Sequence, residues 1–121
     1  MIKFSLVIPC FNEVKNLPLL VEKCLELVSS CDCEILIVNN GSSDGTKEVL
    51  TNLLTPYDRI NLINIETNIG YGHGITEGLK QAKGEILGWT HADLQTDPLD
   101  CLMALKFFND KREVFVKGRR R

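Results

Sequence analysis

Four short stretches of the sequence combine glycine with acidic, amide, imidazole and hydroxyl side chains. They are PCFNE (9–13), NNGSSDGT (39–46), TNIGYGHG (67–74) and THADLQTDP (90–98). The oxygen and nitrogen atoms of such side chains can bind cations, phosphates and sugar hydroxyls. Taken singly, each stretch is also typical of an ordinary turn or helix cap, with Ser43 or Asp44 accepting helix amides. Their repetition in one chain favours a ligand site.

Each polar stretch follows an apolar, β-branched segment that is typical of a strand. Strands are expected at 4–9, 34–39, 60–66, 84–90 and 113–117. Helices are expected from about 14 to 29, 46 to 54, 72 to 82 and 98 to 109. This alternation predicts an α/β fold, with a Rossmann-like, mostly parallel sheet and helices on both faces. Ligands bind beyond the carboxyl ends of such strands, so the four polar stretches should meet there.

The apolar spacing also predicts which helix faces are buried. The first helix should bury Leu17, Leu20, Val21, Cys24, Leu25 and Val28, and the third should bury Ile75, Leu79 and Ala82. Gly84 is expected to end the third helix in a left-handed C-cap. Trp89 lies inside a predicted strand, which favours core packing over stacking on a sugar or base.

Bulk properties narrow the function classes. The 121 residues suit one domain, and a net charge of −2 argues against nucleic acid as the partner. No apolar run is long enough to span a membrane. The five cysteines include only one CxC pair, Cys31 and Cys33, so plain thiols are favoured over structural zinc and a cytoplasmic location is expected.

The glycines of the third polar stretch have two interpretations. Gly70, Gly72 and Gly74 superficially match a dinucleotide fingerprint, but that motif follows the first strand and has different spacing. The favoured interpretation is a turn that lets backbone amides and a helix N-terminus approach a ligand.

In order and spacing, VIPCFNE, IVNNGSSDGT, NIGYGHGITEGLKQAKGE and ADLQTDP resemble the successive motifs of family 2 glycosyltransferases with the GT-A fold. The dolichol-phosphate mannosyltransferase-like branch is the most similar, and the chain matches the first half of its catalytic domain. The resemblance implies transfer of a hexose from a nucleotide-diphosphate sugar, inverting and metal-assisted, to an acceptor that is lipid-linked or a polysaccharide. A non-catalytic nucleotide-sugar-binding or assembly module is the alternative, and self-association is expected of either.

The resemblance also implies residue roles. Pro9, Phe11 and Glu13 line the nucleotide slot, Asn40 takes the position of a base-reading carboxylate, and Asp93 binds Mg²⁺ or Mn²⁺. The remaining expected nucleotide-sugar contacts are Ser42, Gly70, Gly74, His91, Gln95 and Arg120. His91 replaces the first carboxylate of the family's DxD motif, so it contacts either the metal or the ribose and phosphate. No residue matches the catalytic base, which the family places after Arg121.

Overall fold

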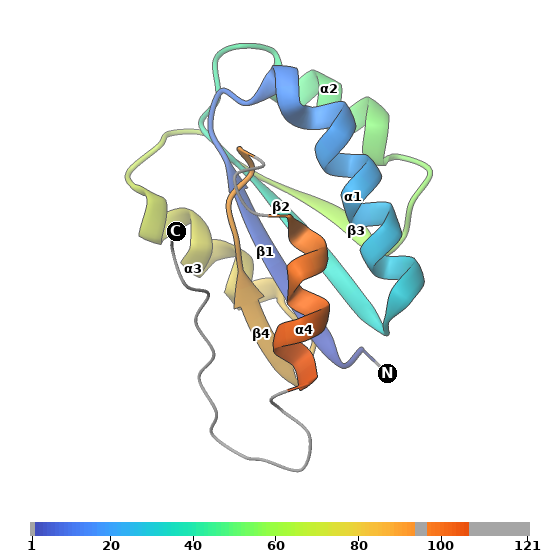
Figure 1. The fold of residues 1–121 in the computed structure, drawn as a ribbon. Helices are drawn as coiled ribbons and strands as arrows, with labels where there is room; N and C mark the ends of the chain where they lie inside the picture. The colour runs from blue at the N-terminus through green and yellow to red at the C-terminus, as the bar shows by residue number, and fades with distance from the viewer. Residues whose placement is uncertain (1, 94–96, 107–121) are drawn as a thin grey trace.

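The computed structural model describes residues 2–93 and 97–106. A parallel sheet forms the centre of this part of the chain. Its strands are β1 (Phe4–Cys10), β2 (Cys33–Asn40), β3 (Ile60–Ile65) and β4 (Ile86–Trp89), in the order β3-β2-β1-β4. All three pairings are parallel, with Val7 aligned on Trp89 and Pro9 on Val38 (Figure 1). The predicted α/β fold with a parallel sheet is therefore confirmed.

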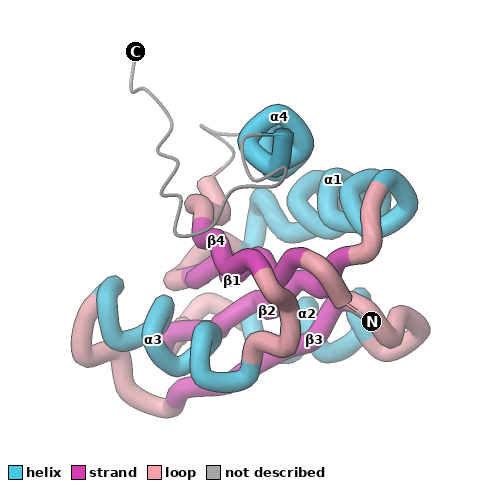
Figure 2. Tube along the Cα trace, turned by 90° about the horizontal axis from the view of Figure 1, so that it is seen from below, coloured by secondary structure: helices cyan, strands magenta, loops and turns pink. Residues whose placement is uncertain are grey.

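Helices cover both faces of the sheet. They are η1 (Val14–Asn16), α1 (Leu17–Ser30), α2 (Thr46–Leu54), α3 (Tyr71–Gln81), η2 (Pro98–Asp100) and α4 (Cys101–Leu105). Figure 2 shows α1 and α4 on one side of the sheet and α3 on the other. Chain order and parallel strands together require crossover connections, which place the end of every described strand at the same edge.

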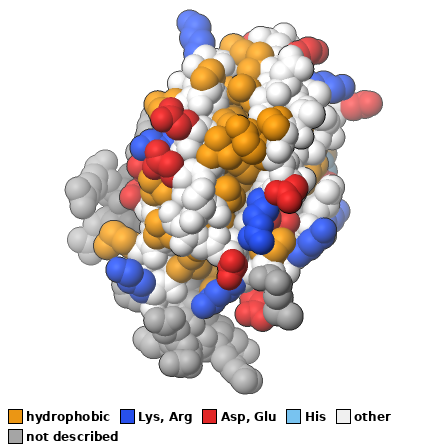
Figure 3. Space-filling view, turned by 90° about the vertical axis from the view of Figure 1, so that its right-hand side faces the viewer, with side chains coloured by type: hydrophobic (Ala, Val, Ile, Leu, Met, Phe, Trp, Pro, Cys, Tyr) orange, Lys and Arg blue, Asp and Glu red, His pale blue; other side chains and the backbone are white. Residues whose placement is uncertain are grey.

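Two apolar clusters hold the layers together. The larger lies between the sheet and α1, α2 and α4, and includes Leu6, Ile8, Leu20 and Ile37. The smaller lies under α3 around Val7, Leu36 and Val38. On the side of the molecule seen in Figure 3, a band of hydrophobic side chains is flanked by acidic and basic side chains. Within the described residues, no helix is both long and apolar enough to cross a bilayer.

Several predicted details of the helices are wrong. The first helix begins as the 3-10 turn η1 because Pro18, near the start of α1, has no amide to donate. On α1, Leu27 is fully buried, whereas Leu25 and Val28 are only partly buried. The fourth helical segment begins with η2, and its predicted end at 109 and the strand at 113–117 lie outside the described residues.

The third helix makes its closest contact with the sheet through glycine, while Leu79 packs against the same sheet face. Gly74 and Gly78 are its buried residues, while Ile75 and Leu79 are partly buried. A Cβ on Gly78 would lie 2.5 Å from a Val7 methyl carbon, so only glycine lets the α3 backbone pack this closely.

The predicted left-handed C-cap at Gly84 is also wrong. The helix ends at Gln81, Ala82 is extended, and Gly84 does not have a positive φ. Gly84 is needed for a different reason, since a Cβ there would lie 2.7 Å from backbone atoms of Phe4 and Ser5. Glycine thus permits the chain to enter β4 against β1.

Trp89 is not a core residue. Its side chain is 48% exposed, as is that of Leu87, because both project from β4, the edge strand of the described sheet, beyond the area covered by α3. Core packing, the favoured interpretation of Trp89, is therefore wrong.

A buried carboxylate ties the amino end of β4 to β1 and β2. Glu34 is 3% exposed, and its Oε2 accepts hydrogen bonds of 2.6 Å from the Ser5 hydroxyl and from the Lys83 amide. The Gly84 amide in turn donates to the Ser5 hydroxyl oxygen at 2.8 Å. This network fixes the connection between α3 and β4 to the sheet.

Buried thiols make the fold sensitive to alkaline pH. Burial, and to a lesser degree neighbouring groups, raises the pKa of Cys10 and of Cys24 to about 12. These thiols deprotonate near pH ~8.5 only in the unfolded chain, so their stabilising effect is complete below that pH and is lost above it. We expect the free energy of unfolding to fall by about 1.4 kcal/mol per pH unit for each thiol, measured by urea denaturation at increasing pH.

Cys24→Ala is the informative comparison for this pH dependence. It removes one of the four thiols whose pKa is raised in the fold, so its slope above pH ~8.5 should be shallower than that of the wild type, whatever its stability at neutral pH. Identical slopes would contradict the assignment.

Candidate active site

The polar turns after the four described strands meet at one edge of the sheet. Each turn is hydrogen-bonded to the next in chain order, so the four form a continuous rim. The contacts run from the first turn to the second, from the second to the third, and from the third to the fourth. The prediction that these sequence stretches come together is confirmed.

The first two turns are joined by Asn12. Asn12 has a left-handed backbone (φ 52°), a conformation that asparagine tolerates better than most residues. Its amide donates to the Ser42 hydroxyl at 3.0 Å, and its side-chain oxygen accepts from the Ser43 amide at 2.8 Å. The two turns therefore hold each other in place.

Asp44 strengthens the same junction. It accepts hydrogen bonds from the Val14 amide and from the amide and hydroxyl of Thr46, the first residue of α2. The bond from the Thr46 hydroxyl, followed by those from the amides, lowers the pKa of Asp44. Asp44 thus stays ionised as a structural acceptor, which confirms the expectation that it accepts an amide of the second helix.

Asn40 joins the second turn to the third by a hydrogen bond. Its Nδ2 donates to the Gly70 carbonyl at 3.2 Å, and the residue is only 3% exposed. Its Oδ1 is buried and has no hydrogen-bond partner within the described residues. Gly41 lies close enough to the third turn that a Cβ would be 2.5 Å from the Asn68 nitrogen. A ligand can reach the side chain of Asn40 only if the Gly70 turn moves.

The two asparagines at the end of β2 face opposite sides of the sheet, as consecutive strand residues must. Asn40 faces α3, and a Cβ on Gly74 would meet it and Pro9. Asn39 faces α2, where its side chain donates to Asn64 and accepts from the Ser42 amide. Asn39 therefore stabilises the turn and lies away from the Pro9 side.

The third and fourth turns meet in an aromatic pair. The Tyr71 hydroxyl lies 3.0 Å from Nδ1 of His91, and the two rings stack with centroids 5.4 Å apart and planes at 19°. Burial, and then the negative charge of Asp93, raises the pKa of Tyr71. Tyr71, His91 and Asp93 thus form one electrostatic cluster at the open end of β4.

The predicted site residues differ in their access to solvent. Those that a ligand can reach directly are Phe11, Gly70, His91 and Asp93, with Glu13 and Ser42 partly exposed. Those buried in the structure are Pro9, Asn40 and Gly74. Gln95 and Arg120 lie outside the described residues. Glu13 also accepts a 2.8 Å hydrogen bond from Asn16, which orients its carboxylate.

The donor chemistry at the rim fits a divalent cation held partly by its ligand. Asp93 is an exposed carboxylate with an imidazole two residues before it. Within the described residues, no three His, Cys, Asp or Glu side chains converge into a metal site. A cation here would therefore depend on Asp93, on His91 and on oxygens supplied by a bound molecule, as is usual for cations that bind substrate phosphates.

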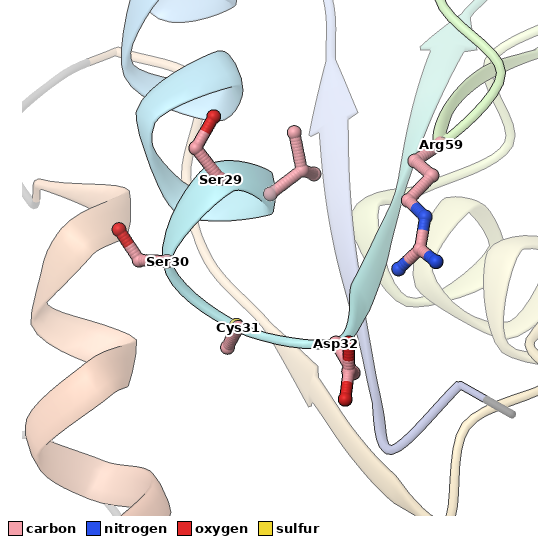
Figure 4. Close-up of a pocket in the computed structure, with 6 residues that line it drawn as sticks. Ser29, Ser30, Cys31, Asp32 and Arg59 are labelled. Carbon is pink, nitrogen blue, oxygen red and sulfur yellow. The ribbon is translucent and has the colours of Figure 1, made fainter.

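The larger surface hollow lies at the opposite end of the sheet. It has a volume of about 470 Å³ and lies beside the starts of β2 and β3, with Asp32 and Arg59 among its lining residues (Figure 4). A smaller hollow of about 240 Å³ lies on the α2 side of the rim, beside Asn39 and Lys47. Neither of these two hollows is lined by Asp93 or His91.

Two residues that hold the turns of the site together were not predicted from the sequence. Asn12 carries a recognisable signal, since asparagine is common in left-handed turns. Tyr71 carries none, because its contact with His91 joins residues 20 positions apart across two different strand ends.

Comparison with known proteins identifies the family. Residues 5–121 match the family model described as Glycosyl transferase family 2. The chain belongs to glycosyl transferase family 2. The predicted resemblance is therefore confirmed.

Two relatives with named activities are similar in sequence to this family 2 chain. It is 38% identical over 96 residues to a dolichyl-phosphate beta-glucosyltransferase of Trichomonas vaginalis, covering 74% of this chain and 30% of the relative. It is 35% identical over 99 residues to an undecaprenyl-phosphate 4-deoxy-4-formamido-L-arabinose transferase of Photorhabdus laumondii, covering 79% and 30%. The chain thus spans about 30% of the length of these relatives.

Two solved structures share the fold. A mannosyltransferase of Pyrobaculum calidifontis, in complex with GDP-Man and Mn²⁺, is 28% identical with a TM-score of 0.60, covering 75% of this chain and 27% of that one. S. aureus TarS is 23% identical with a TM-score of 0.70, covering 90% and 33%, which shows the fold alone. The family 2 chain therefore has the GT-A type of sheet.

Proposed function

We propose that this chain forms the donor-binding part of a glycosyltransferase, which transfers a hexose from a nucleotide-diphosphate sugar to an oxygen of an acceptor. The observation that carries the proposal is the exposed carboxylate of Asp93 on the rim where the four turns meet. A diphosphate brings charge that must be neutralised, and an exposed carboxylate on an open rim is suited to recruit a cation for that purpose.

The mannosyltransferase complex with GDP-Man and Mn²⁺ supports this assignment by similarity. When bound, a divalent cation would neutralise the diphosphate and make it a better leaving group. Asp93 and His91 are the described residues that would hold it. The cation is Mg²⁺ or Mn²⁺.

Other rim residues would bind and orient the donor. Phe11 is 48% exposed and offers a ring face to a nucleobase, while Glu13 is held by Asn16 and can accept from ribose hydroxyls. Gly70 leaves space for the diphosphate, and the backbone amides at the N-terminus of α3 would donate to it. Asn40 supplies an unpaired acceptor for the base once the Gly70 turn shifts.

The reaction proposed is a direct displacement with inversion. The acceptor oxygen bonds to the anomeric carbon, the bond from that carbon to the diphosphate oxygen breaks, and the diphosphate departs with the electron pair. Where the acceptor oxygen carries a proton, that proton passes to a base, a role that is assigned to none of the described residues. The lipid-phosphate relatives support a lipid-linked acceptor. The cytoplasmic location is proposed from the cysteine pattern of the sequence alone. The relatives are transferases, so a non-catalytic module is not favoured.

Calorimetric titration of the chain with UDP, GDP and NAD⁺ tests the proposal. We expect one nucleoside diphosphate to bind on the order of tenfold more tightly with Mn²⁺ than with EDTA, about 1.4 kcal/mol, and NAD⁺ not to bind. The proposal would be contradicted if neither UDP nor GDP bound, or if the nucleotide bound with equal affinity with and without the cation.

A further inference from the structure

The contact between Tyr71 and His91 restricts how His91 can meet a ligand. An imidazole has two ring nitrogens on different edges, and the Tyr71 hydroxyl occupies Nδ1 at 3.0 Å. Stacking of the two rings also limits rotation of the imidazole. Nε2 is therefore the nitrogen that remains available to a molecule bound at the rim.

His91 and Asp93 belong to the same turn after β4. Tyr71 reaches that turn from the start of α3, so the three groups occupy one corner of the site. His91 and Asp93 are both exposed there and are separated by one residue in sequence. A cation recruited by Asp93 would therefore lie next to the His91 ring.

We propose that Tyr71 is a positioning residue that directs Nε2 of His91 to the cation, and that this nitrogen ligand makes the site select Mn²⁺ over Mg²⁺. The proposal rests on the proposed function. In the proposed arrangement, Nδ1–H of His91 donates to the Tyr71 oxygen, which leaves the Nε2 lone pair for the metal. A partner on the second nitrogen orients and tunes a metal-binding histidine in this way.

The selectivity follows from ligand chemistry. Mg²⁺ prefers hard oxygen ligands and gives up its water reluctantly, whereas first-row transition ions accept imidazole nitrogen more readily. A carboxylate at position 91 would suit Mg²⁺ and Mn²⁺ similarly. The imidazole at this position, held by Tyr71, therefore favours Mn²⁺.

The test measures metal binding directly, without turnover. The chain is saturated with GDP or UDP and titrated with Mn²⁺ and with Mg²⁺, and pulsed electron paramagnetic resonance of bound Mn²⁺ detects nitrogen coupling. We expect nitrogen coupling in the wild type and its loss in His91→Asp, together with about a tenfold fall in the Mn²⁺-to-Mg²⁺ affinity ratio. Tyr71→Phe should weaken Mn²⁺ binding by about tenfold and leave Mg²⁺ binding almost unchanged.

Tyr57→Phe is the matched control, since Tyr57 is an exposed tyrosine that follows α2 at the other end of the sheet. It should leave both affinities unchanged. Nucleotide binding that depends on Mn²⁺ but shows no nitrogen coupling, or an affinity ratio unchanged in His91→Asp, overturns this inference and leaves the proposed function standing. Absence of any nucleotide binding in the wild type overturns both.

Discussion

Asp93→Ala is expected to weaken Mn²⁺-dependent binding of GDP or UDP by on the order of 100-fold, about 2.7 kcal/mol. Asp93 is the exposed carboxylate at the corner where the third and fourth turns meet. Its removal leaves a cation with the imidazole of His91 and the phosphate oxygens, so the diphosphate loses much of its charge neutralisation. Calorimetric titration with Mn²⁺ and with EDTA measures the effect, which should disappear in EDTA.

Asp58→Ala is the control for this variant. Asp58 is an exposed carboxylate that precedes β3, at the edge of the sheet opposite the rim, and its removal changes the net charge equally. It should bind nucleotide as the wild type does. Wild-type affinity of Asp93→Ala in Mn²⁺ would show that the metal assignment is wrong.

Glu34→Ala is expected to lower the free energy of unfolding by about 3 kcal/mol. The substitution leaves the Ser5 hydroxyl, which is buried, and the Lys83 amide, which is partly buried, without their common acceptor. Each unpaired buried donor costs about 1–3 kcal/mol. Urea denaturation followed by circular dichroism measures the change.

Glu34→Gln separates the hydrogen bonds from the rest of the side chain. Glutamine keeps the length and one acceptor oxygen, so the loss of stability should be smaller than for alanine. Equal losses in the two variants would mean that the hydrogen bonds to Ser5 and Lys83 contribute little.

The fold was predictable because its signals are local. The apolar segments that became β1 and β2 are buried along their whole length, and each is followed by a polar turn. Alternation of such segments with helices leaves few topologies other than a parallel sheet. The meeting of the four turns followed from that topology alone.

The details that failed depend on contacts between distant residues. Exposure of Trp89 depends on the place of β4 at the sheet edge, which no local pattern encodes. Gly78 and Gly84 are required by backbone approaches to β1, more than 70 positions earlier in the chain. Burial of Asn40 likewise results from the Gly70 turn folding over it. Sequence spacing identifies such residues as candidates but does not show which neighbour constrains them.

The glycine-rich surface of α3 affects how the rim moves. Glycine lowers the intrinsic stability of a helix by about 1 kcal/mol per residue relative to alanine, and α3 contains Gly72, Gly74 and Gly78. Contact with the sheet must therefore supply most of the free energy that keeps this segment helical. Its first turn, next to Gly70, is the part of the rim with the smallest cost of local opening, and opening there uncovers Asn40. The backbone that shields Asn40, for which we propose a role in reading the base, is thus also the backbone best suited to yield to an arriving nucleotide.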